Sequence, residues 1–359
     1  MLSFYGSHFY FEIKCKKCLK ETPVRNGFSS KRSAILIKEI ARDFYMITLP
    51  MPFRLKHVNI YALVHDGRTT LFDTGLNTPE TFAAIETGLK RIGRSIHDID
   101  RIFITHRHGD HCGMAGRIKD LSGAAILMSD TDHAFIRIAE DQNRLIAELR
   151  SFYVRHGLGD DALALLGSIF RSFSKMIGTF PLDHALRPGE VHIVGDRSFE
   201  VLAAPGHSIG QVCFFFRSEG ILLAGDHILP DITPNLSPDL FQTDFRPLER
   251  FLSSLTEMQR LPVKTVYPAH GRPFANFVER IAEIKDHHQE RKGLTLASVR
   301  KGRKSTCEVS VDIFGKDLPE FDQYLALNET YVHLVELIHE GLVQEEIEDN
   351  RCFYKETPL

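Results

Sequence analysis

His106-Arg-His108-Gly-Asp110-His111 places four potential metal ligands within six residues, directly after the mainly apolar run Arg101-Ile-Phe-Ile-Thr105. An apolar, β-branched run of this kind predicts a buried strand, so the four side chains follow a strand end. Three more potential ligands follow predicted strands in the same way: His207 in Ala204-Pro-Gly-His-Ser, Asp226 in Leu223-Ala-Gly-Asp-His and His270 in Tyr267-Pro-Ala-His-Gly.

The surroundings of these ligands predict one shared site. Because strand ends in such a fold point to one edge, and Gly or Pro beside each ligand lets the backbone turn sharply, we expect the side chains to meet in one crevice. Histidine and aspartate offer nitrogen and oxygen ligands, which suit Zn²⁺, Mn²⁺ or Fe²⁺ better than Ca²⁺ or Mg²⁺.

Length and composition limit the classes of protein to which this chain can belong. The chain has 359 residues, which predicts one large domain with an appendage. A hydrophobic fraction of 43% and a charged fraction of 25% exclude wholesale disorder. The formal net charge of -3 gives no global basic field for nucleic acid or a membrane surface. The apolar runs are too short to span a bilayer, no signal peptide is recognisable, and the six scattered Cys form no disulfide framework, so we expect a cytoplasmic protein.

The order of predicted elements indicates a sandwich of sheets with helices outside. Residues 1–33 predict a loosely attached N-terminal arm, and short strands separated by turns follow it. Thr78-Pro-Glu-Thr predicts a helix that ends before Gly93. Residues 130–185 predict a helical insertion, with two amphipathic helices broken at residues 157–159. Strands and helices then resume, which is typical of an α/β or α+β protein.

Residues 286–359 predict a winged-helix-like C-terminal domain. The capping box Ser305-Thr-Cys-Glu308 begins a short helix, and Phe321 to Gly341 fits a longer one. Leu342 to Lys355 fits a β-ribbon that turns at Asp349-Asn350. From Ser305 onward the chain has 13 acidic and 3 basic residues (Lys and Arg), so this region should repel a phosphate backbone.

The ligand motifs together resemble the metallo-β-lactamase superfamily of hydrolases. His-x-His-x-Asp-His is followed, in this order, by a Gly-His, a Gly-Asp and an Ala-His-Gly, and the resemblance spans roughly residues 35 to 275. It implies an α+β protein with the αββα sandwich of that family. The catalytic domain would then cover residues 34–285, with residues 130–185 inserted as a lid.

The resemblance also implies two divalent metal ions, with zinc expected and manganese or iron as alternatives. The expected ligands of the first ion are His106, His108 and His207. The expected ligands of the second ion are Asp110, His111 and His270, and Asp226 is expected to bridge both ions.

Three residues receive further roles from the same resemblance. Asp110 is expected to carry a proton to the leaving group. His227, beside the bridging Asp226, is expected to contact the substrate or its oxyanion, and the alternative is a buried, hydrogen-bonded histidine. Asp73, in Leu71-Phe-Asp-Thr-Gly75, matches the family's buried aspartate that orients metal ligands; the alternative is a helix or turn cap.

Two positions at which branches of the family differ limit the reactions that we expect. His108 stands where a glutamate would mark the family's oxygen-reducing di-iron branch, which favours hydrolysis. Asp226 stands where true β-lactamases carry Cys or Ser, and is similar to the glyoxalase II, lactonase and nuclease branches. We therefore expect a dinuclear hydrolase in which a hydroxide between the metal ions attacks a small-molecule thioester, ester or lactone.

Two other function classes stay open. The predicted tail resembles that of β-lactamase-like proteins related to a mitochondrial single-stranded-RNA endonuclease, and the basic run Arg300-Lys-Gly-Arg-Lys304 either contacts a phosphate chain or is a solvated linker. A metal-bound sensor or scaffold is the third class, although the complete ligand set favours an enzyme. The tail is expected to pack on the catalytic domain or on a second subunit of a homodimer.

The insertion carries the only sequence signal for the substrate. Its aromatic and sulfur side chains either form an apolar lid, which implies an acyl or aromatic substrate, or simply form the helix core. These residues are Phe152, Phe170, Phe173, Met176 and Phe180.

Overall fold

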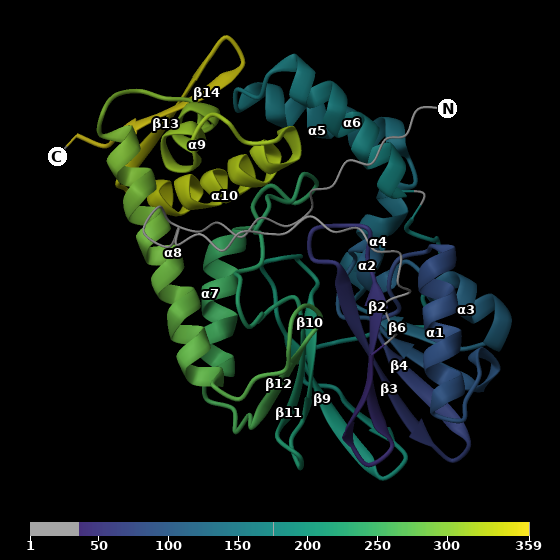
Figure 1. The fold of residues 1–359 in the computed structure, drawn as a ribbon. Coiled ribbons are helices and arrows are strands. Elements are labelled where there is room, and N and C mark those ends of the chain that lie inside the picture. The colour runs from purple at the N-terminus through teal and green to yellow at the C-terminus, as the bar shows by residue number, and fades with distance from the viewer. Residues whose placement is uncertain (1–35, 175, 359) are drawn as a thin grey trace, which may run out of the picture.

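Two β-sheets packed face to face form the centre of the protein, and helices cover the outer side of each. The structure is a computed structural model that describes residues 36–174 and 176–358, so the expected arm over residues 1–33 lies outside the described residues. In Figure 1, α7 (Pro247–Met258) and α8 (Phe277–Val299) flank one sheet, whereas α1 (Pro79–Arg91) and α3 (Ala115–Ser122) flank the other. This order of layers confirms the αββα sandwich.

The strands of the two sheets follow the chain almost in order. In the part of the chain that the structure describes, the first sheet consists of β1 (Ile37–Ala41), β2 (Phe44–Pro50), β3 (His57–His65), β4 (Arg68–Phe72), β5 (Ile99–Phe103), β6 (Ala125–Met128) and β7 (His184–Ala185). The second sheet consists of β12 (Thr265–Pro268), β11 (Ile221–Gly225), β10 (Val212–Phe216), β9 (Arg197–Ala203) and β8 (Val191–Val194). β4, β5 and β6 run parallel, as do β11 and β12, so their carboxyl ends meet at one edge.

Phenylalanine rings fill the space between the sheets. Phe72 and Phe103 of the first sheet stack with their centroids 5.4 Å apart. Phe214 of the second sheet lies 5.3 Å from Phe72. Side chains alternate across a strand, so Phe214 and Phe216 face this core while Phe215 faces the outer core beneath α7 and α8. The continuous run of three phenylalanines is therefore a strand buried on both faces.

The insertion contains three helices where two were expected. They are α4 (Asp130–Ala139), α5 (Gln142–Arg155) and α6 (Asp160–Ser174). The break between α5 and α6 falls at the predicted position. The additional helix α4 is only ten residues long and has its own N-cap, since the Ser129 side chain accepts a hydrogen bond from the Asp132 N–H. A helix this short presents too few turns for its periodicity to stand out.

The C-terminal region has the predicted order of elements. It contains α9 (Thr306–Phe314), α10 (Glu320–His339), β13 (Val343–Glu348) and β14 (Arg351–Glu356). The capping box at Ser305 and Glu308 forms, and Asp349 and Asn350 both adopt positive φ, as a two-residue hairpin turn requires. The expected domain boundary at residue 285 falls inside α8, which therefore belongs to both regions. Assignment to the winged-helix class stays a prediction.

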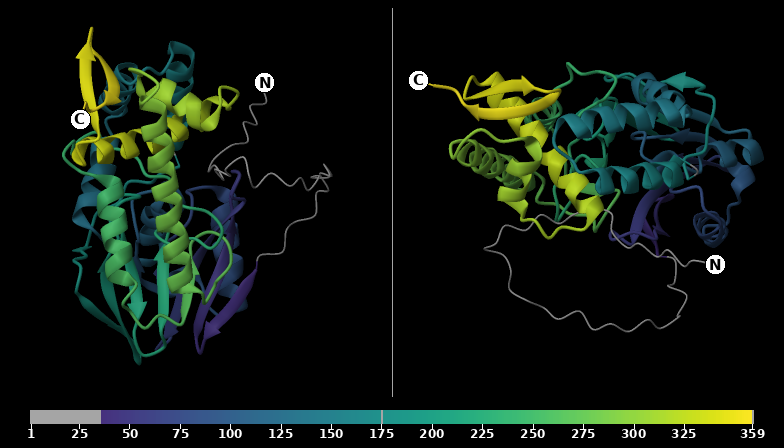
Figure 2. Two further views of the ribbon diagram at one scale, coloured as in Figure 1. Left: turned by 90° about the vertical axis from the view of Figure 1, so that its left-hand side faces the viewer. Right: turned by 90° about the horizontal axis from the view of Figure 1, so that it is seen from above.

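The insertion and the C-terminal region lie together above one end of the sandwich. Figure 1 shows α5 and α6 beside α10 and the β13–β14 ribbon, and Figure 2 shows the same arrangement from above. Leu145 and Leu149 of α5 pack with Leu327 of α10 in one apolar cluster. Two short helices complete the fold, η2 (Ile96–Asp98) and α2 (Gly109–Cys112). In the described ranges, no helix combines the length and hydropathy that a bilayer crossing requires.

Candidate metal centre

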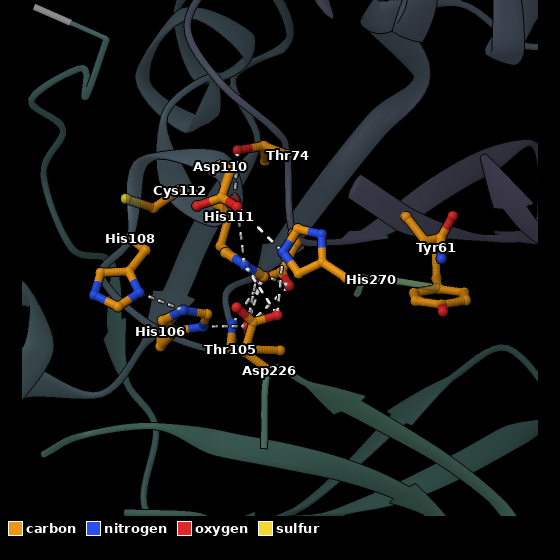
Figure 3. Close-up of polar contacts among 12 residues, drawn as sticks. Tyr61, Thr74, Thr105, His106, His108, Asp110, His111, Cys112, Asp226 and His270 are labelled. Atoms are coloured by element: carbon orange, nitrogen blue, oxygen red, sulfur yellow. Dashed lines mark hydrogen bonds and ion pairs between the residues drawn. The ribbon is translucent and has the colours of Figure 1, made fainter. Parts of the chain in front are cut away.

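Strand ends hold all seven expected ligands at one edge of the sandwich. His106 and His108 follow β5, and α2 then presents Asp110 and His111. The remaining three, His207, Asp226 and His270, follow β9, β11 and β12. A close approach at Gly206 positions His207, because φ is +139° there and a Cβ would lie 2.5 Å from the Cβ of Phe251. Figure 3 shows six of the seven side chains converging.

The first expected ligand set forms a compact group of imidazoles. The ligand atoms of His106, His108 and His207 all lie within 4.8 Å of one another. His106 Nε2 and His108 Nδ1 are 3.0 Å apart. The other nitrogen of His207, Nδ1, donates to the backbone oxygen of Asn235 at 2.7 Å, which turns Nε2 toward the group. The three nitrogens could therefore hold one metal ion.

The second expected set combines two imidazoles with a carboxylate. Asp110, His111 and His270 also place one ligand atom each within 4.8 Å of one another. His270 Nε2 lies 3.3 Å from Asp110 Oδ2. Its Nδ1 donates to the backbone oxygen of His57 at 2.8 Å, which fixes the orientation of the ring.

Asp226 lies between the two sets. Its Oδ2 is 3.5 Å from His207 Nε2, on the side of the first set. Its Oδ1 is 3.3 Å from His270 Nε2 and 3.5 Å from His111 Nε2, on the side of the second set. One oxygen facing each set is the arrangement that a bridging carboxylate needs.

Asp73 supports the ligands from behind. Its Oδ2 accepts a hydrogen bond from His111 Nδ1 at 2.8 Å. Its Oδ1 accepts from the Thr105 backbone N–H at 2.8 Å, and Thr105 Oγ1 lies 3.0 Å from His106 Nδ1. Asp73 has a φ of 60°, a backbone conformation that non-glycine residues rarely adopt. These are the contacts that an aspartate orienting metal ligands would make, and within the described ranges none of them caps a helix.

The protonation of the centre favours ligand binding. Burial and the neighbouring imidazoles lower the pKa of His106 and of His108, so both rings are neutral and present a lone pair. Burial would raise the pKa of Asp110, but His111 and His270 outweigh it and lower the pKa to about 2. Burial would lower the pKa of His270, but Asp226 and Asp110 raise it to about 10. A cation bound here would displace the proton of His270, so binding should release protons.

A cavity of about 540 Å³ opens beside the centre. His108, Asp110 and His207 line one end of it. Most of the remaining wall is apolar and comes from the insertion and α10. The wall includes Leu145, Leu149, Ile169 and Phe170 of the insertion and Phe321, Tyr324 and Leu325 of α10. This volume is in the range of small-molecule sites.

Comparison with known proteins agrees with the geometry. The sequence profile of the metallo-beta-lactamase superfamily matches residues 54–270, which contain all seven ligands. The chain belongs to this superfamily. A solved structure of a metallo-beta-lactamase family protein from Thermus thermophilus is 31% identical, with a TM-score of 0.77 over 89% of this chain and 100% of that one. The superfamily resemblance inferred from the motifs is therefore confirmed.

Curated relatives of the superfamily point to hydrolysis. A probable metallo-hydrolase of Bacillus subtilis, YqjP, is 25% identical over 87% of this chain and 98% of its own length. An atrochrysone carboxyl ACP thioesterase of Aspergillus fumigatus is 27% identical over 120 residues, which is 33% of this chain and 35% of that protein. The superfamily and these names identify the protein as a hydrolase.

Only some of the residues expected to form the apolar lid line the cavity. Phe170 and Met176 line the cavity, as a lid requires. Phe152 instead packs against Tyr153, with ring centroids 5.0 Å apart, and Phe180 is buried in the core outside the first sheet. The side chain of Phe173 lies outside the described residues. Both interpretations of the insertion thus hold, for different residues.

His227 does not reach the cavity. It is fully buried, its Nε2 shares a hydrogen bond of 3.0 Å with Ser254 Oγ, and its ring lies 4.9 Å from that of Phe251. It is not among the described residues that line the cavity. The position fits the alternative of a buried, hydrogen-bonded histidine, and we propose no catalytic role for it.

Sequence reasoning missed two parts of the site. Arg107 lines the cavity within the ligand motif, with its guanidinium 3.7 Å from the Phe135 ring centroid and 3.1 Å from Asp239. Its place between two ligands was a usable signal. The wall formed by Phe321 and Tyr324 had no such signal, because α10 (Glu320–His339) begins 50 residues after His270, the last of the expected ligands, and carries no ligand motif.

Proposed function

We propose that this hydrolase cleaves carboxylic thioesters or esters with an apolar acyl group. The observation that carries the proposal is the apolar cavity of about 540 Å³ that ends at His108, Asp110 and His207. An acyl chain in this cavity would place its carbonyl carbon at the metal centre. Burying the chain would supply binding energy at about 25 cal/mol per Å² of apolar surface.

The donor set fits two divalent ions, zinc before manganese or iron. We propose His106, His108 and His207 for one ion, and Asp110, His111 and His270 for the other, with Asp226 shared. Within the described residues, the buried atoms Asp110 Oδ2 and His111 Nε2 make no hydrogen bond, which a metal ligand explains. Bound metal ions would polarise the substrate carbonyl and lower the pKa of water.

The protein's own groups complete the proposed reaction. Asp110 lines the cavity with an ionised carboxylate, so it can accept a proton from the attacking water and pass it to the departing thiolate or alkoxide. Asp73 and Thr105 keep His111 and His106 in position. The apolar walls exclude water from the acyl side.

Two observations favour this reaction over RNA cleavage. The Aspergillus fumigatus relative is named as an ACP thioesterase, which supports an acyl thioester substrate. The basic run is paired within the chain, since Arg303 donates to Glu346 and Glu348, and Lys304 donates to Asp312. Cations neutralised in this way contribute little to phosphate binding.

The experiment is thiol release from acyl-CoA, acyl-carrier-protein and acyl-glutathione thioesters of increasing chain length. Metal-loaded protein should hydrolyse some of them, and a chelator-treated sample should not. If protein shown to hold metal released thiol from none of these thioesters, the proposal would be overturned. Single-stranded RNA would then be the next substrate to test.

A further inference from the structure

A second group of potential metal ligands lies between α8 and α10, and none of its members is among the described residues that line the cavity. His287 and His288 of α8 and Glu329 of α10 each place one ligand atom within 4.8 Å of the other two. His288 is 1% exposed and Glu329 is 2% exposed. Such burial is costly for polar groups unless something satisfies them.

A chain of hydrogen bonds fixes the tautomer of His288. His333 Nδ1 lies 2.6 Å from the backbone oxygen of Glu329, which can only accept, so this nitrogen carries a proton. In the neutral ring, His333 Nε2 is then an acceptor, and His288 Nδ1 donates to it at 3.2 Å. His288 Nε2 is left as a bare lone pair.

The local electrostatics support this assignment. Burial lowers the pKa of His288 to about 3 and also lowers the pKa of His333, so both rings are neutral. Burial would raise the pKa of Glu329, but the nearby side chain of His287 outweighs it and lowers the pKa, so the carboxyl is ionised. One ring nitrogen of His288 and one carboxylate oxygen of Glu329 lie within 4.8 Å of each other, and both residues are buried.

Each of the three residues has a buried side-chain atom that makes no hydrogen bond with the described residues. Among the described residues, none is a hydrogen-bond partner of His287 Nε2, His288 Nε2 or Glu329 Oε1, and all three atoms are buried. The distance from His287 Nε2 to Glu329 Oε1 is 3.7 Å, too long for a good hydrogen bond. Asp110 Oδ2 and His111 Nε2 of the catalytic centre show the same lack of partners.

A group at the sheet edge shows that this pattern is not general. His184, Glu190 and His192 are the same residue types within the same 4.8 Å limit. There, however, Glu190 Oε2 lies 3.0 Å from His184 Nε2 and 3.1 Å from His192 Nε2, so the three side chains satisfy one another. Residue type and distance alone do not distinguish the two groups, whereas hydrogen bonding does.

Arg291 is the charge nearest to Glu329 that would oppose a cation. Its Nε lies 3.9 Å from Glu329 Oε1. Its guanidinium carbon, however, lies 4.5 Å from the ring centroid of Phe314, so the aromatic face shares the stabilisation of this charge. The long contact does not satisfy Glu329 Oε1.

We propose that His287, His288 and Glu329 bind a structural divalent metal ion, zinc by the chemistry of two imidazoles and one carboxylate. The ion would tie α10 to α8, and α10 carries Phe321, Tyr324 and Leu325 of the cavity wall. The fourth coordination position would hold a water molecule. This site is separate from the catalytic centre and contributes no reacting group.

Zinc content tests the proposal directly. The full-length chain is loaded with Zn²⁺ alone, desalted, and its zinc is measured per chain by mass spectrometry. Glu329→Gln preserves the shape of the side chain and should hold one zinc fewer than the unsubstituted protein. Glu190→Gln is the matched control in the sheet-edge group and should lose none.

A second background separates this site from the catalytic centre. A His207→Ala, Asp226→Ala, His270→Ala chain, which leaves each catalytic set only two of its three ligands, should still retain one zinc, and adding Glu329→Gln should remove it. Equal zinc in Glu329→Gln and the unsubstituted protein would overturn the proposal, as would an equal loss in Glu190→Gln. Should circular dichroism show that Glu329→Gln is unfolded, His287→Gln replaces it, because the His287 side chain is 23% exposed and tolerates exchange.

Discussion

The two ends of the catalytic cavity are built in opposite ways. At one end, His108, Asp110 and His207 stand on tight loops at strand ends, and hydrogen bonds such as that from His207 to Asn235 fix their rings. At the other end, Leu149 and Phe170 come from helices held by apolar contacts. Hydrogen bonds impose one geometry, whereas apolar packing tolerates several. We therefore expect the first end to govern reaction rate and the second to govern substrate choice.

The largest expected effect is at the metal end. Asp110→Ala removes a proposed metal ligand and the proposed proton carrier together. Turnover should fall by more than the roughly 10- to 100-fold that loss of an outer ligand partner costs. Turnover is measured with the best thioester of the panel, and circular dichroism checks the fold. Full activity in a folded Asp110→Ala protein would refute the two-metal mechanism.

Weakening the hydrogen bond by which Asp73 orients His111 should reduce turnover less than removing a proposed metal ligand does. Asp73→Asn keeps the shape but weakens the hydrogen bond from His111 Nδ1. We expect metal affinity or turnover to fall by about 10- to 100-fold, because the ring of His111 loses its orienting charge. Competition with a chromophoric chelator measures the affinity. Unchanged affinity together with unchanged turnover would mean that Asp73 only closes a turn.

The apolar end should change selectivity and leave the chemistry intact. Phe170→Ala removes a half-buried ring from the cavity wall. We expect kcat/KM for long acyl chains to fall by about tenfold, since apolar burial is lost, with little change for acetyl thioesters. Ile169→Trp, one position earlier, narrows the same wall and should also penalise long chains. A uniform loss across chain lengths in both variants would contradict a selectivity role.

The smallest expected effect is a pH dependence of the unfolding free energy, caused by His156 at the end of the helix that supports the apolar end of the cavity. His156 ends α5 and is buried, with Nδ1 3.0 Å from Thr306 Oγ1. Burial, and then Arg155, lower its pKa to about 3. Since the unfolded chain takes up this proton near its ordinary pKa of about 6.5, stability is complete above that pH and falls as the pH drops.

Between pH 7 and pH 6 this histidine should account for about 0.7 kcal/mol of lost unfolding free energy. His156→Gln should therefore unfold in urea with a shallower pH dependence than the unsubstituted chain. Equal pH dependence in the two proteins would show that His156 does not carry this loss. Turnover on short thioesters is compared at both pH values, because the metal end should be unaffected.

Local motifs were predictable because their physical causes are local. A β-branched run followed by Gly or Pro and a ligand residue predicts a strand end by itself, so all seven expected ligands were found before any contact was known. The capping box at Ser305 and the hairpin turn at Asp349-Asn350 are similar cases, since each depends on neighbours within four residues. Their function as metal ligands stays a prediction that zinc content and activity must test.

Other features depended on residues distant in sequence. The role of His227 was open because the sequence cannot say whether the ring turns to the metal centre or to Ser254. Phe152 and Phe170 have the same helical spacing, yet Phe170 lines the cavity whereas Phe152 packs against Tyr153. Helical spacing defines a face, and the neighbour of that face is set by packing.

The sequence by itself determined the superfamily, the sandwich of α+β class and the identity of the side chains that gather at the metal centre, because strand ends and turn residues encode them locally. The tertiary structure alone determined the cavity wall from α10, the inward turn of Arg107 and the unsatisfied group at His288 and Glu329. These features arise where chain segments far apart in sequence pack together, and no local pattern specifies which segments meet.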